Sequence, residues 1–136
     1  MNRRAMLEIV RRAGRATPWL SLAASAAGLA LSSGLVGSPS DYALAPGRLV
    51  DGELFRLWTG HFVHYGSAHL WGDLLAFAFW AAAVERSSRR LFAVTLFCAT
   101  PLLSLGILLA CPELREYRGL SGLDCALVVE LILVRG

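Results

Sequence analysis

The sequence predicts an all-α membrane protein, and three observations lead to that class. Of the 136 residues, 56% are hydrophobic and only 17% are charged, whereas soluble domains carry about 25% charged residues. The hydrophobic residues are gathered into four long runs. All thirteen basic residues are arginines that flank these runs, and the absence of a basic stripe with interleaved aromatic residues argues against nucleic-acid binding.

The four runs predict membrane-spanning helices at about 18–36, 68–84, 91–110 and 119–134. A helix needs roughly 20 apolar residues to cross the hydrocarbon core, within a range of about 17–25. The first three runs meet this length, and the fourth is short, as if cut near its inner end. The first run also resembles a signal peptide, but its length and the three runs that follow favour a retained helix.

The arginines predict how these helices are oriented. Two clusters flank the runs: Arg3, Arg4, Arg11, Arg12 and Arg15 before the first, and Arg86, Arg89 and Arg90 between the second and third. Because cytoplasmic loops are enriched in arginine, we expect both clusters to be cytoplasmic and the loop 38–67 to face outward. The sequence thus predicts a cytoplasmic segment 1–17 followed by a membrane domain at 18–136.

Three polar residues lie at a common depth in these predicted spans. Ser121 opens the fourth run, and His69 and Asp73 open the second run one helical turn apart. At a rise of about 1.5 Å per residue, Ser121, Asp73 and His69 lie roughly 21, 18 and 24 Å above the inner membrane edge. Because polar groups are costly to bury in a bilayer, their presence suggests a functional site.

These residue types suit the hydrolysis of a peptide bond. A serine hydroxyl needs an adjacent base to become a nucleophile, and the tetrahedral intermediate needs donors aimed at its oxyanion. Gly119 and Gly122 let the backbone approach closely around Ser121, which frees an N–H for the oxyanion and lets a neighbouring helix pack tightly. The alternatives are a Gly–Ser helix contact, an interfacial His69, and an Asp73 that only holds helices together.

The residues resemble the rhomboid family of intramembrane serine proteases. The resemblance is carried by the segments GELFR (52–56), TGHFVH (59–64), AHL (68–70) and YRGLSG (117–122). The TGHFVH and GLSG segments are most similar to the rhombosortase branch, which is associated with trimming C-terminal anchor segments from exported bacterial proteins. The resemblance implies a rhomboid-like helical bundle in the bacterial inner membrane, with four helices present of an expected six.

The resemblance also implies partners and residue roles. Its substrates are transmembrane or C-terminally anchored proteins within the lipid bilayer. Ser121 matches the nucleophile, with its own N–H in the oxyanion hole, His69 matches the oxyanion histidine, and His64 is a supporting residue. Asp73 stands where many rhomboids carry an asparagine. Because an ionised aspartate only accepts hydrogen bonds, Asp73 either donates in its protonated form or orients His69.

Two further expectations concern what the residues lack. Cys98, Cys111 and Cys125 show no metal-ligand spacing, so we expect no metal and no organic cofactor. The family's general-base histidine, on its sixth helix, has no counterpart here, because all three histidines precede Ser121. We therefore expect an N-terminal portion of a rhombosortase-like protease with little activity of its own. The alternative is a non-catalytic pseudoprotease that binds transmembrane segments, whereas a helical protein without protease ancestry leaves the motifs unexplained.

Overall fold

The computed structural model describes residues 17–135, which form helices, as the sequence predicts. The arginines predicted to make the segment 1–17 cytoplasmic (Arg3, Arg4, Arg11, Arg12 and Arg15) lie outside the described residues. In chain order the elements are α2 (Trp19–Ser32), the 3-10 turn η1 (Pro39–Asp41), α3 (Pro46–Val50), α4 (Arg56–Thr59), α5 (Ser67–Ser87), α6 (Arg89–Val94), the π-helical turn η2 (Thr95–Ala99), α7 (Thr100–Ala110) and α8 (Ser121–Arg135).

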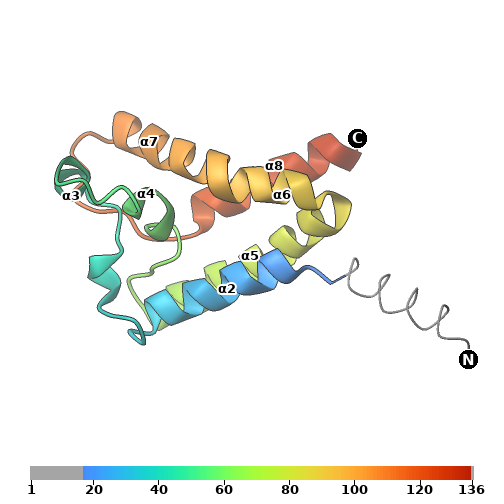
Figure 1. Cartoon of the computed structure of the whole chain (residues 1–136), viewed down its shortest axis with the longest axis horizontal. Coiled ribbons are helices and arrows are strands. Elements are labelled where there is room, and N and C mark those ends of the chain that lie inside the picture. Colours follow the sequence, from blue (N-terminus) through green and yellow to red (C-terminus); the bar gives the residue numbers. More distant parts are fainter. Residues whose placement is uncertain (1–16, 136) are drawn as a thin grey trace, which may run out of the picture.

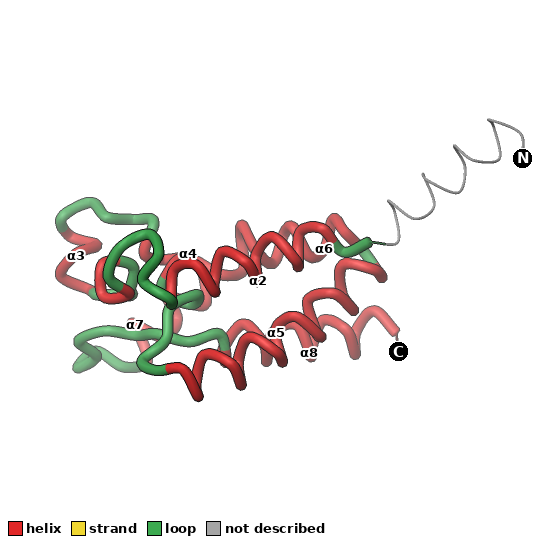
Figure 2. The backbone as a smooth tube through the Cα atoms, turned by 90° about the horizontal axis from the view of Figure 1, so that it is seen from below, coloured by secondary structure: helices red, strands yellow, loops and turns green. Residues whose placement is uncertain are grey.

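The long helices form a bundle in which α5 packs against both α2 and α8. The continuous helix made by α6, η2 and α7 runs back along the bundle in the direction opposite to α5 (Figure 1). The short helices α3 and α4 gather with the loops at one end of the bundle, where α7 ends (Figures 1 and 2). The loop 38–67 therefore covers the end of the bundle at which α8 begins.

The core lies between α5, α6 and α8. On α5 the buried residues recur every three or four positions, which places them on one face of the helix. That face packs against α6 and α8, and the buried cluster consists of Leu70, Leu74, Phe77, Ala81, Val84, Phe92, Leu120, Leu123 and Leu127. Leu123 and Leu127 lie on one face of α8 and Leu120 directly precedes it, so this packing fixes the position of the helix that begins with Ser121.

Two of the described helices are long and apolar enough to cross a membrane. They are α5 and the continuous helix Arg89–Ala110, with 21 and 22 residues. The predicted span at 18–36 corresponds to α2, which has only 14 residues, and the predicted span at 119–134 corresponds to α8, which has 15. Both are shorter than a helix that crosses the hydrocarbon core alone, so the structure supports two of the four predicted spans by length.

The start of α2 is held by a carboxylate from another helix. The preceding residue, Pro18, provides no side-chain cap. Instead, Glu85 near the end of α5 accepts hydrogen bonds from the N–H groups of Leu20 and Ser21, at 3.2 and 2.8 Å. The Glu85 Oε1 also accepts a hydrogen bond from the Arg89 Nε–H, at 3.2 Å. Because the first N–H groups of a helix have no intrahelical acceptor, Glu85 satisfies donors that α2 itself leaves open.

The long helix Arg89–Ala110 is irregular just before Pro101. A proline lacks the N–H that would bond the carbonyl one turn earlier, and the π-helical turn η2 (Thr95–Ala99) accommodates this change. The Thr100 hydroxyl donates to the Thr95 carbonyl at 2.9 Å. The Thr95 hydroxyl donates to the Glu130 carboxylate of α8. Glu130, an acidic residue inside the fourth apolar run, therefore has its polar partner on the neighbouring helix.

Candidate active site

Ser121 is the first residue of α8, and its side chain is exposed. The turn into the helix depends on Gly119, which has a φ of +132°, a conformation that residues with a Cβ rarely adopt. A Cβ at Gly119 would also lie 3.2 Å from His69 Cε1 and 3.3 Å from Asp73 Oδ2. Gly119 thus allows both the turn and the close approach of α5, whereas a Cβ at Gly122 would meet only the Tyr117 hydroxyl, at 3.4 Å.

Asp73 joins α5 to the segment that carries the serine. Its Oδ2 accepts a hydrogen bond from the Leu120 N–H at 3.1 Å, next to Ser121 in the chain. The same oxygen lies 3.1 Å from His69 Nε2. The structure therefore brings the predicted pair His69 and Asp73 together with the Gly119–Ser121 segment. The Asp73 carboxylate thus faces hydrogen-bond donors. An ionised carboxylate can only accept hydrogen bonds, so this position suits it.

His69 is the accessible histidine of this group, with 40% of its side chain exposed. Its ring lies edge-on to the His64 ring, with centroids 5.1 Å apart, and it also touches the position of Gly119. Its Nε2 is the ring nitrogen that faces Asp73. A ring held in this way can act as a hydrogen-bond donor beside Ser121 when both of its nitrogens are protonated.

His64 is buried behind His69, with only 1% of its side chain exposed. Its Nδ1 lies 3.1 Å from the Ser32 hydroxyl, which also donates to the Phe62 carbonyl at 2.9 Å. His64 Nε2 lies 3.4 Å from Asp73 Oδ2, outside good hydrogen-bond geometry. Burial lowers the pKa of His64 below its usual value. His64 therefore connects the end of α2 with the segment around Asp73.

His61 belongs to a separate, fully buried network. Its Nε2 lies 2.9 Å from the Ser104 hydroxyl, and that hydroxyl donates to the Leu57 carbonyl at 2.6 Å. Since the single proton of Ser104 goes to Leu57, His61 is the donor in the first bond. Burial lowers the pKa of His61 to about 4, so it is neutral at physiological pH. It ties the loop 38–67 to α7.

Two features of the loop support the serine segment, and sequence reasoning assigned neither of them. Leu44 and Tyr117 form an antiparallel bridge, with N–H···O distances of 3.1 and 2.8 Å. The Gly119 N–H donates to the Gly60 carbonyl at 3.3 Å. The loop is itself held by buried Arg56, which donates to Glu53 at 2.6 Å and to the Ala43 carbonyl at 2.8 Å. In the sequence, Tyr117 stands out only as the first residue of the segment YRGLSG (117–122), and the resemblance gave it no role of its own.

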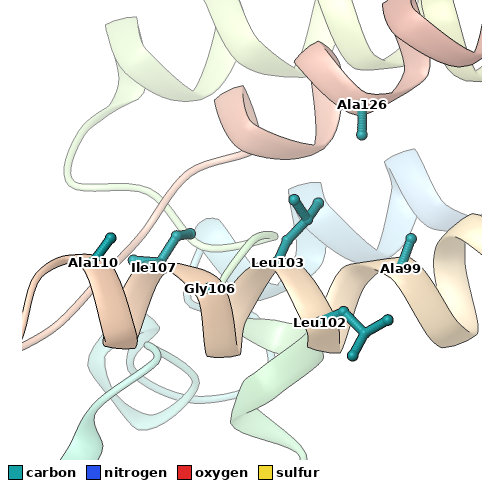
Figure 3. Close-up of a pocket in the computed structure, with 7 residues that line it drawn as sticks. All are labelled: Ala99, Leu102, Leu103, Gly106, Ile107, Ala110 and Ala126. Carbon is teal, nitrogen blue, oxygen red and sulfur yellow. The ribbon is translucent and has the colours of Figure 1, made fainter.

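A groove of about 530 Å³ lies between α7 and α8, away from these polar residues. Figure 3 shows Leu103 and Ile107 on one wall and Ala126 of α8 on the other. Every residue that lines the groove is apolar or glycine. The groove therefore has no group that could take part in hydrolysis.

A helical bundle with an exposed serine at a helix start, beside a histidine and a carboxylate, defines the class of protein as a candidate intramembrane serine hydrolase. The family model described as the Rhomboid domain matches residues 51–135, more than half of the chain. The chain belongs to the rhomboid family, whose members are generally intramembrane serine proteases. Comparison with curated proteins and with solved structures gives no match.

Proposed function

We propose that this protein contributes the nucleophile and oxyanion site of an intramembrane serine endopeptidase. The observation that carries the proposal is the placement of Ser121: its hydroxyl is exposed at the start of α8, beside His69 and Asp73 of α5. Hydrolysis needs a nucleophile that water and substrate can both reach, together with donors for the developing negative charge. This arrangement supplies both within a helical bundle.

In the proposed reaction, the Ser121 oxygen attacks the carbonyl carbon of the substrate and the carbonyl oxygen becomes an oxyanion. The Ser121 N–H is one of the helix-start donors that no intrahelical carbonyl takes, so it is available to the oxyanion. The second donor is His69, held by Asp73 Oδ2 at 3.1 Å. Asp73 positions the site, since its Oδ2 also takes the Leu120 N–H. Gly119 keeps the backbone close enough for these bonds.

A base for the Ser121 proton is not found among the histidines that the structure describes. Among the described residues no histidine forms a hydrogen bond with Ser121, because His61 bonds Ser104, His64 bonds Ser32 and His69 faces Asp73. Using His69 as the base would also remove it from the oxyanion. The exposed side of α8 that carries Ser121 and Cys125 leaves room for such a group.

We further propose a rhombosortase-like substrate class, namely exported proteins held in the bacterial inner membrane by a C-terminal anchor. The motifs TGHFVH (59–64) and GLSG (119–122) support this branch. In the predicted orientation, with a cytoplasmic N-terminus, Ser121 faces the outer side, where the anchor of an exported protein meets the membrane surface. A cut there releases the exported domain from its anchor.

The proposal is tested in membranes that contain the intact protein, with a fluorophosphonate probe and a C-terminally anchored reporter. Ser121→Ala is expected to abolish both probe labelling and release of the reporter. Ser67→Ala is the matched control, since Ser67 is an exposed serine that begins α5, and it should leave both signals unchanged. If wild-type protein and Ser121→Ala bind the reporter equally and neither cuts it, the non-catalytic binding role replaces the protease.

A further inference from the structure

A pocket of about 420 Å³ lies where the end of α2, the start of α5 and the loop 38–67 meet the segment before Ser121. It shares no lining residue with the apolar groove between α7 and α8. Its walls include hydroxyl, aromatic and charged side chains, among them Ser32, Tyr65, Trp71 and Arg118. Ligand sites usually combine apolar walls with a few polar groups of this kind, so the pocket suits a small polar group.

Arg118 supplies the charge of this pocket. It is the one arginine among the described lining residues, and none of them is an aspartate or a glutamate. Only 14% of the Arg118 side chain is exposed. Its guanidinium lies over the Tyr65 ring, with Cζ 5.0 Å from the ring centroid, and its Nη2 lies 3.1 Å from Glu116 Oε1. The cation is therefore held in place and largely removed from water.

The pairing of this cation is incomplete. Glu116 contacts Arg118 through Nη2, while the buried Nε of Arg118 has no hydrogen-bond partner within residues 17–135. The Glu116 side chain is 37% exposed, so water weakens its attraction for the guanidinium. Glu116 also does not line the pocket. The pocket therefore keeps a positive charge, and a buried cation is stable only when it is paired.

The start of α5 adds to the same preference. Gly66, which also lines the pocket, is the N-cap of this 21-residue helix, and no side chain caps it. The first N–H groups of a helix have no intrahelical acceptor, and the helix dipole makes this end favourable for negative charge. The helix start and Arg118 belong to different parts of the chain, and both favour an anion.

The pocket lies beside the candidate active site. Arg118 directly precedes Gly119 and stands three residues before Ser121. On the other side, His64 lines the pocket, and its ring centroid is 5.1 Å from that of His69. A group bound in the pocket is therefore separated from His69 by a single ring. A peptide bound at Ser121 can reach it with a side chain close to the bond that is cut.

We propose that this pocket binds an acidic side chain of the substrate, an aspartate or a glutamate near the bond that Ser121 cuts, and that Arg118 determines this specificity. The inference rests on the proposed function and names a feature of its substrates. The substrate carboxylate completes the pairing of Arg118, because a guanidinium binds a carboxylate through charge-assisted hydrogen bonds. Glutamine has nearly the same shape without the charge, so the pocket distinguishes the two.

The test uses membranes that contain the intact protein and a set of C-terminally anchored reporters. Glu, Gln or Lys is placed in turn at each position around the cut, and kcat/KM is measured per molecule labelled at Ser121 by the fluorophosphonate. Arg118→Gln is compared with Arg115→Gln. Arg115 is the matched control, because it is an exposed arginine of the same segment that does not line the pocket.

We expect the wild type to prefer Glu over Gln at one position by roughly 10- to 100-fold, the usual effect of a hydrogen bond to a charged group, with Lys cut most slowly. Arg118→Gln should abolish this preference, and Arg115→Gln should keep it. The proposal is overturned if a wild type that labels at Ser121 shows no such preference, or if Arg118→Gln retains it. An equal loss for all reporters in Arg118→Gln also overturns it, since the pocket then holds another anion, such as a lipid phosphate.

A second variant covers the case in which Arg118→Gln does not fold. Glu116→Gln leaves Arg118 in place and removes its exposed partner, so the guanidinium is more available to the substrate. We expect the preference for Glu over Gln to increase, and a preference that stays the same or falls contradicts the proposal. A wild type without any Ser121-dependent labelling refutes the proposed function itself, and the substrate preference with it.

Discussion

At the scale of single residues, the site depends on which groups donate and which accept. Asp73 stands where an amide donor is common in the family, but its Oδ2 faces the Leu120 N–H and His69 Nε2. A carboxylate can accept hydrogen bonds from both groups, whereas it can donate one only when it is protonated. We therefore propose that Asp73 orients the donors around it and does not itself donate to the oxyanion.

His61 predicts that the fold is sensitive to acid. Its pKa is about 4 in the folded protein, against 6.5 for a histidine exposed to water. Between these pH values the unfolded chain binds the extra proton, so stability is full above pH 6.5 and falls as pH drops. The loss is about 3 kcal/mol once pH reaches 4. Burial also lowers the pKa of His64, which adds to the loss in the same direction.

The measurement is the free energy of unfolding in detergent between pH 7.5 and 4 for wild type and His61→Gln. Glutamine retains a donor for Ser104 and has no charge to gain. We expect the variant to lose less stability on acidification than the wild type does. Identical slopes for the two proteins would show that His61 is not the group that takes up the proton.

At the scale of elements, the loop 38–67 and the start of α8 fold as one unit. Gly60 is central to it, because its carbonyl accepts the Gly119 N–H while its Cα lies against Leu44. A Cβ at Gly60 would stand 2.6 Å from Leu44 Cβ and 2.7 Å from the Leu44 backbone nitrogen. Backbone at that distance cannot move aside without disturbing the bridge between Leu44 and Tyr117.

We therefore expect Gly60→Ala to lower stability by about 1–3 kcal/mol, the usual cost of overpacking, and to slow labelling of Ser121. Gly47→Ala is the matched control in the same loop, because a Cβ at Gly47 would meet nothing within 4 Å. The check is the thermal midpoint of both variants together with their labelling rates. Equal midpoints for the two variants would mean that the loop relaxes around the added methyl group.

The long elements could be predicted from the sequence, and the connections between them could not. Apolar runs identified α5 and the helix Arg89–Ala110 to within a few residues, because those helices are set by local composition. The sequence did not predict the short helices α3 and α4, because their apolar residues do not recur at the spacing of a helix. The roles of Glu85 and Tyr117 depend on Ser21 and Leu44, which are distant in the chain. The proximity of His69 and Asp73 was predictable from their spacing of four residues.

At the scale of the whole molecule, α5 and the helix Arg89–Ala110 form a hairpin that turns at Ser88. The Ser88 hydroxyl caps α6 by accepting from the Leu91 N–H at 3.2 Å. Arg86, Arg89 and Arg90 surround this turn, while Cys111 is exposed at the far end of α7. The enrichment of arginine in cytoplasmic loops predicts that the turn faces inward and Cys111 outward.

This orientation predicts that a membrane-impermeant maleimide labels Cys111 in intact cells. In a Cys98→Ala, Cys111→Ala and Cys125→Ala background, Ser87→Cys should react only after the membrane is permeabilised. Ser87 is exposed beside the turn, which makes it a suitable reporter. Labelling at Ser87→Cys in intact cells, with Cys111 protected, would establish the opposite orientation and would place Ser121 on the cytoplasmic side.

The bridge between Leu44 and Tyr117 also dictates an order of assembly. It joins a residue shortly after α2 to one shortly before α8, and pairings that distant in sequence form late because a long stretch of chain must first be closed. While the chain is being inserted, α2, α5 and α7 can be in place before Tyr117 has met Leu44. We therefore expect the helices to form before the segment that carries Ser121 reaches its final place.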